Sequence, residues 1–138
     1  MLAILWILTN VLLQAPASER PAKLDFEFFR AKVQPIFLAR RPGHARCYAC
    51  HSQGTPFRLQ ALSDDSQSWD EDQSRRNFEA ALRVVVPGNP EKSALIRMPL
   101  ATEAGGVRFH PGGKHWSSPS DPECQVIVAW IRGATGSD

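Results

Sequence analysis

The chain of 138 residues lacks several features that mark large classes of protein. Its sixteen Lys and Arg residues are spread along the sequence, so it has no basic stripe of the kind that nucleic-acid binding requires. Its three cysteines are an odd number, and a disulfide framework cannot pair them all. No Ser-His-Asp set, phosphate-binding loop or paired-carboxylate pattern is present, which leaves hydrolase and transferase chemistry without support.

Strand-forming patterns are scarce as well, because the only β-branched run, "RVVVP", closes a helical pattern. The length suits one compact domain. The chain is therefore predicted to be mostly α, a small helical domain with long loops. Apolar spacing and turn signals predict helices over 24–39, 71–85, 90–97 and 122–132, and loops over 52–70 and 103–116.

The last predicted helix has the clearest boundaries. Asp121 is placed to cap it, Pro122 suits its first turn, and Gly133 suits the position after its end. Pro35, by contrast, is expected to kink or divide the first helix. The second helix is expected to place Phe78, Leu82 and Val85 on one face. The last helix is expected to bury Ile127, Trp130 and Ile131.

The sequence also has no mostly apolar run as long as a typical membrane span. Residues 1–13 are mostly apolar, but as a helix they reach about 20 Å, against about 30 Å of hydrocarbon. Ala15-Pro16-Ala17 follows as an A-x-A-like cleavage signal, so residues 1–17 are predicted to be a signal peptide and 18–138 the remaining domain. The usual positive n-region is missing, and an uncleaved N-terminal anchor or a short buried helix is the alternative.

What the sequence does contain is Cys47-Tyr48-Ala49-Cys50-His51, a C-x-x-C-H pattern. Two thiols three positions apart can add to the two vinyl groups of a haem, and the adjacent histidine is then delivered to the iron. The pattern predicts one covalently attached haem c, with Cys47 and Cys50 as the thioether residues and His51 as the proximal iron ligand. The apparent export signal agrees with this, since haem is attached to such proteins outside the cytoplasm.

Two other chemistries fit a pair of cysteines less well. A Cys-x-x-Cys redox pair usually follows a strand within a βαβ pattern, and no such pattern is present. A zinc site needs a second pair of ligands at close spacing. His110 and His115 are the available pair, but they lie in a Pro-Gly-Gly loop where the geometry is poor.

Three separated segments resemble bacterial c-type cytochrome domains of planctomycetes and acidobacteria. They are "FFRAKVQPIFLARRPGHARCYACH", "VVPGNPEKSALIR" and "DPECQVIVAWIRGA", and they occur in the expected order over roughly residues 25–134. The resemblance implies a small cytochrome c-like helical domain with long loops wrapped around one haem.

A six-coordinate haem needs a second axial ligand from another segment, and Met98, His110 and His115 are the candidates. His44 lies only three residues before Cys47, on the proximal side, and would struggle to reach across the ring. In the resembled domains a distal Met commonly lies in a Met-Pro-Pro-Gly-like loop before the final helix. Laid over that loop, "HPGG" puts His110 at the ligand position, so His110 is favoured over Met98, whose Met-Pro dipeptide keeps it as the alternative.

Further residues near the expected ligand loop have weaker assignments. Arg97, Arg108 and Lys114 are candidates to pair with haem propionates, with solvated surface charge as the other interpretation. Trp116 and Trp130 are candidates to pack on the porphyrin, although a core position already accounts for Trp130. Cys124 is interpreted as a small buried hydrophobic residue.

The sequence thus predicts a monohaem c-type cytochrome in the periplasm, not an enzyme, that carries one electron at a time between redox protein partners. No nucleic acid is expected as a partner, and membrane contact is expected only through an uncleaved N-terminal segment. Two alternatives remain. One is a haem c subunit fixed in a larger membrane redox complex, and the other is a haem-based enzyme or gas sensor with an exchangeable distal ligand.

Overall fold

The computed structural model describes residues 22–137, and 42% of them are helical. Within this range no strand forms, and only two isolated bridges occur, between Arg41 and His44 and between Leu100 and Trp116. The prediction of a small, mostly helical domain is confirmed. The predicted signal segment 1–17 lies outside the described residues, among which no helix is long and apolar enough to cross a membrane.

The first helical run changes its winding twice. It begins as α1 (Phe26–Phe28), continues as the π-helical η1 (Phe29–Val33) and ends as the 3₁₀ helix η2 (Gln34–Phe37). Asp25 caps it, because its Oδ1 accepts the Phe28 amide at 2.6 Å. Pro35 was expected to kink or divide the helix, and the run does change from π to 3₁₀ winding at Gln34, with Pro35 in the first turn of η2.

α3 (Glu71–Leu82) is shorter than predicted. A capping box fixes its start, with the Asp70 carboxylate accepting the Gln73 amide at 2.7 Å. Past Leu82 the Arg83 and Val84 amides donate to the Ala80 and Ala81 carbonyls, three residues back, which closes the helix with a tight last turn. Leu82, the last residue of the helix, is 40% exposed, so its predicted place on a common apolar face with Phe78 and Val85 was wrong.

The predicted helix over 90–97 is split in two. It forms η3 (Pro90–Lys92) and α4 (Ala94–Arg97), with Ser93 between them in extended conformation. The Ser93 hydroxyl is buried, donates to the Asn89 carbonyl and accepts the Val86 amide, each at 2.9 Å. These side-chain bonds compete with helical ones and break the run. A further 3₁₀ turn, η4 (Thr102–Ala104), lies at the start of the predicted loop.

α5 (Pro122–Ile131) follows its sequence signals closely. The Asp121 carboxylate caps it, and Gly133 adopts a φ of 101°, which only glycine takes at little cost. Trp130 is fully buried, with its ring 5.2 Å from that of Phe29 and its indole N–H donating to the Asp25 carbonyl at 2.9 Å. The predicted buried face is confirmed, since Ile127, Trp130 and Ile131 are all fully buried.

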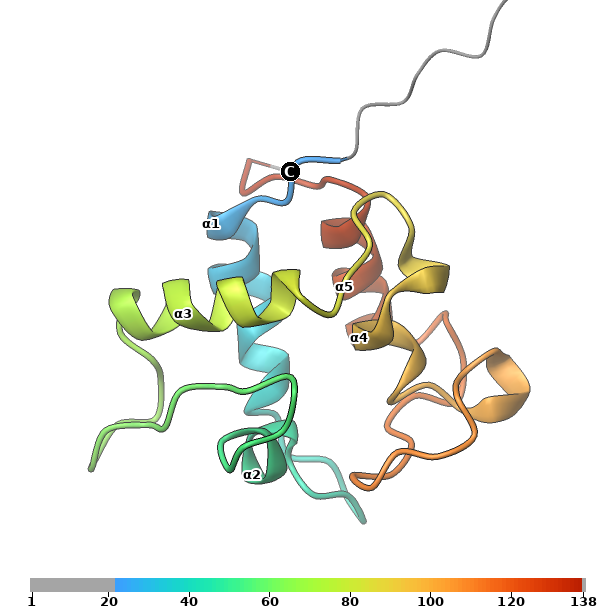
Figure 1. Cartoon of the computed structure of the whole chain (residues 1–138), viewed down its shortest axis with the longest axis horizontal. Helices are drawn as coiled ribbons and strands as arrows, with labels where there is room; N and C mark the ends of the chain where they lie inside the picture. The colour runs from blue at the N-terminus through green and yellow to red at the C-terminus, as the bar shows by residue number, and fades with distance from the viewer. Residues whose placement is uncertain (1–21, 138) are drawn as a thin grey trace, which may run out of the picture.

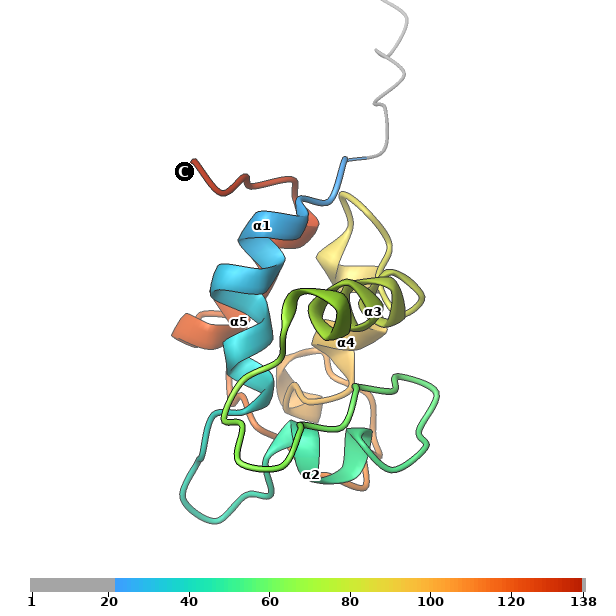
Figure 2. The ribbon, with the colours of Figure 1, turned by 90° about the vertical axis from the view of Figure 1, so that its left-hand side faces the viewer.

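The elements form one core with two distinct ends. The α1–η2 run packs along α5, and α3 crosses this pair (Figures 1 and 2). The first and last described residues lie together at one end, where the Gly136 amide donates to the Asp25 carboxylate at 3.2 Å. The short helix α2 (Cys47–His51) and the loop after η4 lie at the opposite end (Figure 1).

Candidate functional site

The C-x-x-C-H segment folds as α2, a helix of five residues that sequence reasoning did not define. Positions i, i+3 and i+4 of a helix share one face, so the two thiols and the imidazole project to the same side. Cys47, Cys50 and His51 all line one cavity, and both thiols are free. Cys47 is half-buried and Cys50 is exposed, which places the pair at the edge of that cavity.

A backbone carbonyl fixes the orientation of His51. Its Nδ1–H donates to the Phe57 carbonyl at 2.6 Å, and the Thr55 hydroxyl lies 2.8 Å from the same nitrogen. The segment is held in place because the Leu59 amide donates back to the His51 carbonyl at 2.8 Å. With the proton on Nδ1, the lone pair is left on Nε2, which is the arrangement that metal-ligating histidines adopt.

His110, which lies in the loop after η4, is oriented in the same way. Its Nδ1–H donates to the Gly113 carbonyl at 2.7 Å, which again leaves the lone pair on Nε2. Gly113 has a φ of 84°, and a Cβ on Gly112 would lie 3.2 Å from the His110 ring. The Gly-Gly pair therefore lets the loop fold tightly around this imidazole.

The two imidazoles lie together in the cavity. Their ring centroids are 6.3 Å apart and their planes are inclined by 29°. A metal–imidazole bond is about 2 Å long, so two imidazoles on opposite sides of one ion have centroids about 6 Å apart. The distance between the ring centroids of His51 and His110 matches that spacing. Burial also lowers the pKa of His51, which favours the neutral imidazole that a metal requires.

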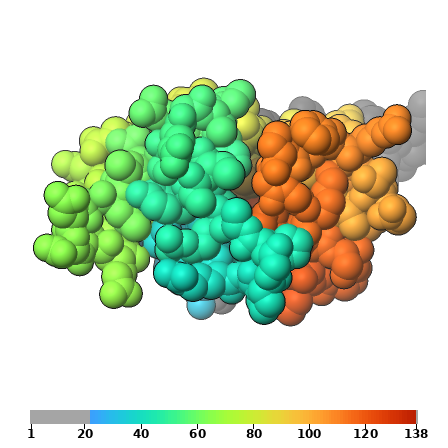
Figure 3. Space-filling view, turned by 90° about the horizontal axis from the view of Figure 1, so that it is seen from below, coloured from blue at the N-terminus to red at the C-terminus, as the bar shows by residue number. Residues whose placement is uncertain are grey.

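The cavity has a volume of about 340 Å³, within the usual range for a cofactor site. Figure 3 shows its mouth as a hollow between the segment around α2 and the loop after η4. Its walls are mainly apolar and come from four parts of the chain, including Phe37, Phe57, Leu95 and Trp116. An apolar, partly enclosed cavity with two inward imidazoles and two thiols at its edge fits a flat, hydrophobic, iron-bearing group.

Met98 and His115 also line this cavity, so the structure brings all three predicted distal candidates together. Met98 is half-buried at the end of α4. The Nδ1 of His115 is buried and has no hydrogen-bond partner among the described residues. Burial, with further contributions from Arg41 and the nearby histidines, lowers the pKa of His115 to about 4. His44 is exposed and does not line the cavity.

The basic residues singled out from the sequence lie outside the cavity lining. Lys114 is occupied, because its Nζ donates to the backbone carbonyls of Met98, at the end of α4, and Val107. Arg97 and Arg108 are exposed to solvent. Arg46, which sequence reasoning missed, is the cationic side chain that does line the cavity. Its position directly before the first motif cysteine was the available signal.

The two tryptophans considered for packing on the porphyrin lie in different parts of the fold. Trp116 is buried in the cavity wall, whereas Trp130 packs in the helical core, with its ring 5.9 Å from that of Phe78. Cys124 is fully buried, and burial raises the pKa of its thiol to about 11. It therefore sits as a small buried hydrophobic residue.

The two alternatives, a zinc site and a Cys-x-x-Cys redox pair, both lack the structure that they need within residues 22–137. No three His, Cys, Asp or Glu side chains converge there in a way that could hold a metal ion, whereas a structural zinc site takes four. A haem iron differs, because the porphyrin supplies four nitrogens and the protein only the axial ligands. A βαβ unit of the redox-pair type is likewise not formed by this range, which contains no strand.

Comparisons with protein-family models, with curated proteins and with solved structures found no match. The resemblance to bacterial c-type cytochromes therefore stays a prediction from the sequence, and the argument for function rests on the geometry of the cavity.

Proposed function

We propose that this chain is a monohaem c-type cytochrome that carries one electron at a time between redox proteins. The observation that carries the proposal is the pair of imidazoles, His51 and His110, with centroids 6.3 Å apart in an apolar cavity edged by Cys47 and Cys50. Each imidazole has its Nδ1–H committed to a backbone carbonyl, so that both Nε2 atoms are free for iron.

The residues have distinct tasks in this proposal. Cys47 and Cys50 each add S–H across a vinyl C=C, so that one C–S bond forms per cysteine and the thiol hydrogen passes to the neighbouring vinyl carbon. His51 is the proximal ligand, and His110 is the favoured distal ligand over Met98. The bound haem iron supplies the one-electron chemistry. The apolar walls exclude water and limit the reorganisation that accompanies a change of charge.

Bis-histidine ligation has a chemical consequence. A thioether ligand favours ferrous iron and raises the reduction potential, whereas imidazole lowers it. The proposed His51/His110 pair therefore makes this a lower-potential carrier than a His/Met protein. With His51 and His110 both bound, the sixth position would be filled, which favours a carrier over an enzyme or gas sensor with an exchangeable ligand.

We also propose export to the periplasm, because residues 1–17 carry the features of a signal peptide and haem attachment to such chains takes place outside the cytoplasm. N-terminal sequencing of the mature protein tests this directly. Ser18 as the first residue supports cleavage, whereas an intact Met1 indicates the anchored alternative, in which the chain belongs to a membrane redox complex.

The decisive experiment is to express the full chain with a cytochrome c maturation system and extract the purified protein with acid–acetone. We expect the haem to stay with the protein and the visible spectrum to be low-spin in both oxidation states. The matched variant C47A/C50A should release its haem, while C124A should retain it. Release from the wild type contradicts the c-type assignment, and rapid carbon monoxide binding to the reduced wild type contradicts the filled sixth position.

A further inference from the structure

A largely buried ion pair lies behind the part of the cavity wall that contains Cys47. Arg41, in the turn after η2, pairs with Glu123 in the first turn of α5, and its Nε donates to the Glu123 carboxylate at 2.7 Å. Only 13% of the Arg41 side chain is exposed. The Trp116 indole N–H donates to the same carboxylate oxygen at 3.3 Å, and Trp116 itself lines the cavity. The pair is therefore part of the structure that supports the wall.

The guanidinium of Arg41 is fixed in one orientation. Its Nη1 and Nη2 donate to the carbonyls of Ala39 and Ile36, at 3.4 and 3.2 Å, in addition to the bonds with Glu123. Ile36 lines the cavity as well. A planar guanidinium whose donors are committed on several sides has little freedom to move, so its positive charge stays beside the wall.

The charge of Arg41 acts on the Cys47 thiol. Burial raises the pKa of this thiol, whereas the positive charge of Arg41 and the hydrogen bond that Arg41 donates to the sulfur lower it; the carboxylate of Glu123 acts in the opposite direction. The thiolate is the nucleophilic form of cysteine, so Arg41 favours the reactive form of a thiol that burial alone would keep protonated. Cys50, by contrast, is exposed to solvent.

The chain itself holds the other groups that bond formation requires. α2 places both thiols and the His51 imidazole on one face, and backbone carbonyls fix the imidazoles of His51 and His110. Cys47 and Cys50 line the same cavity as the two imidazoles, so a flat group held between the imidazoles lies within reach of both thiols. Reactants held in this way react in an effectively intramolecular step, which supplies much of what an enzyme would.

We propose that the folded chain forms its own thioether bonds with haem, without an assembly enzyme, and that Arg41 promotes the bond at Cys47. The inference rests on the proposed function and adds an activity of the polypeptide itself. At each cysteine the S–H bond and the π bond of one vinyl group break, and one C–S and one C–H bond form, so the step is redox-neutral. Cys47 attacks as a thiolate beside Arg41, the proton that it loses is balanced by the one that the terminal vinyl carbon gains, and Arg41 stays protonated throughout.

The test uses the full chain, expressed without maturation enzymes and purified with its thiols reduced. It is mixed with haem under argon in the presence of dithionite, which keeps the iron ferrous. We expect a low-spin complex to form first and covalently bound haem to accumulate after it. Intact mass measures the attachment, and the pyridine haemochrome band moves to shorter wavelength as each vinyl group is consumed. A wild type that forms no covalent product would overturn the proposal.

Two variants that each keep one motif cysteine separate the two bonds. C50A can attach haem only at Cys47, and C47A only at Cys50. Adding R41Q is expected to slow attachment on the order of tenfold in C50A and by less than about twofold in C47A. The effect reflects the loss of a hydrogen bond to a charged group, offset in part because a thiolate of higher pKa is the better nucleophile. Equal slowing in both backgrounds, or slowing in neither, would contradict the role of Arg41.

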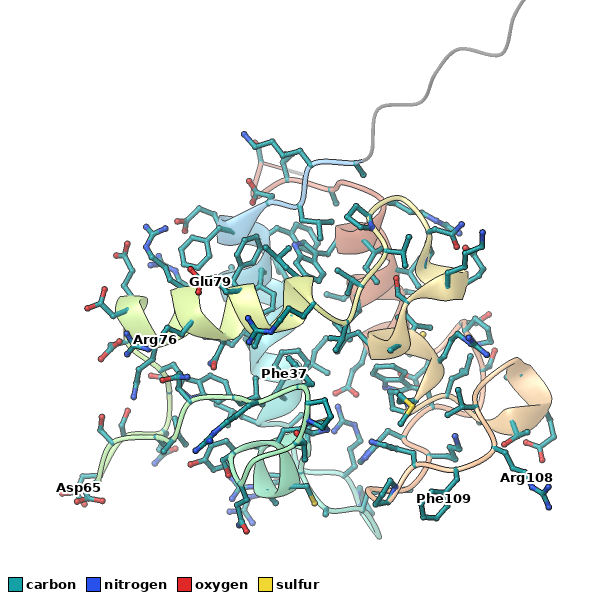
Figure 4. The ribbon with its side chains drawn as sticks, in the orientation of Figure 1. Phe37, Asp65, Arg76, Glu79, Arg108 and Phe109 are labelled. Atoms are coloured by element: carbon teal, nitrogen blue, oxygen red, sulfur yellow. The ribbon has the colours of Figure 1, made fainter. Side chains whose placement is uncertain are left out.

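E123Q carries the opposite prediction and keeps the proposal testable if R41Q does not fold. Glutamine retains an oxygen for the Arg41 Nε and the Trp116 indole, but it removes the negative charge that opposes the thiolate. E123Q should therefore accelerate attachment in C50A severalfold, and an unchanged or slower rate would count against the proposal. R108Q controls for the loss of a positive charge, because Arg108 is exposed, does not line the cavity and points away from the ribbon (Figure 4). It should leave both rates unchanged, and slowing equal to that of R41Q would mean that net charge alone is responsible.

Failure of self-attachment and failure of the proposed function give different results. If the wild type takes up haem as a low-spin complex but never attaches it, while cells with a maturation system yield covalent low-spin protein, then the chain needs an assembly enzyme and only self-attachment is wrong. If protein from such cells releases its haem on acid–acetone extraction, the c-type assignment itself is wrong.

Discussion

Replacing His110 by alanine is expected to convert the holoprotein from low-spin to high-spin haem. The substitution removes an imidazole whose Nδ1 is anchored 2.7 Å from the Gly113 carbonyl and whose centroid lies 6.3 Å from that of His51. The loss should open the sixth coordination position and allow carbon monoxide to bind the reduced protein.

The size of the effect follows from how the ligand is held. In the wild type the loop has already restricted the imidazole, whereas free imidazole added to H110A pays about 4 kcal/mol or more for lost translation and rotation. Added imidazole should restore the low-spin spectrum. Half-saturation is expected at a concentration on the order of millimolar, which corresponds to a binding free energy of about −4 kcal/mol. H110M should stay six-coordinate and raise the reduction potential on the order of 0.1 V.

Absorption spectra and a spectroelectrochemical titration measure these changes. H44A is the matched control, because the His44 ring packs 5.1 Å from that of His115 but is exposed and does not line the cavity; the variant should keep the low-spin spectrum of the wild type. An unchanged H110A spectrum would refute the reasoning. If M98L then lost the low-spin spectrum, and the ferric wild type showed a methionine–iron charge-transfer band, Met98 would be the distal ligand instead.

Three further outcomes are expected. Alkylation of the unfolded holoprotein should find one thiol, at Cys124, because the other two cysteines are consumed as thioethers; three thiols would contradict attachment. In the folded protein Cys124 should stay unmodified at pH 8, since its pKa of about 11 keeps it protonated and the thiolate is the nucleophile. G112A should broaden or shift the His110 resonances in NMR spectra, because its Cβ would lie 3.2 Å from the ring, and unaltered resonances would show that the loop yields. N77A should lower the free energy of unfolding by about 1–3 kcal/mol in denaturant titrations, because the buried amide oxygen of Asn77 accepts the Gln60 amide at 2.7 Å; a smaller loss would mean that water replaces it.

Much of the helical framework was predictable because its signals are local. Asp121, Pro122 and Gly133 are adjacent to the ends of α5, and their effects on the backbone do not depend on distant contacts. The split at Ser93 was not predictable, since it depends on a hydroxyl that bonds to backbone groups four and seven residues away. The early end of α3, where the Arg83 and Val84 amides bond to carbonyls three residues back, likewise has no adjacent capping residue to signal it.

The candidate site also has a part that local sequence predicts and a part that depends on contacts between distant segments. Cys47, Cys50 and His51 form a contiguous motif, and one short helix suffices to bring them together. The orientation of His51 depends on the carbonyl of Phe57, and a carbonyl carries no sequence signal because every residue has one. Choosing among the distal candidates needs tertiary distances, which periodicity does not contain.

The two ends of the described chain meet beside Asp25, and the cavity mouth opens at the opposite end (Figures 1 and 3). A domain coupled to an electrode or a bead through either end therefore turns its mouth toward the solution. Tags or fused domains at residue 22 or 137 are attached on the far side from the histidine pair. An oriented layer, with one attachment chemistry for both ends, therefore presents the cavity to partners and small reagents in solution.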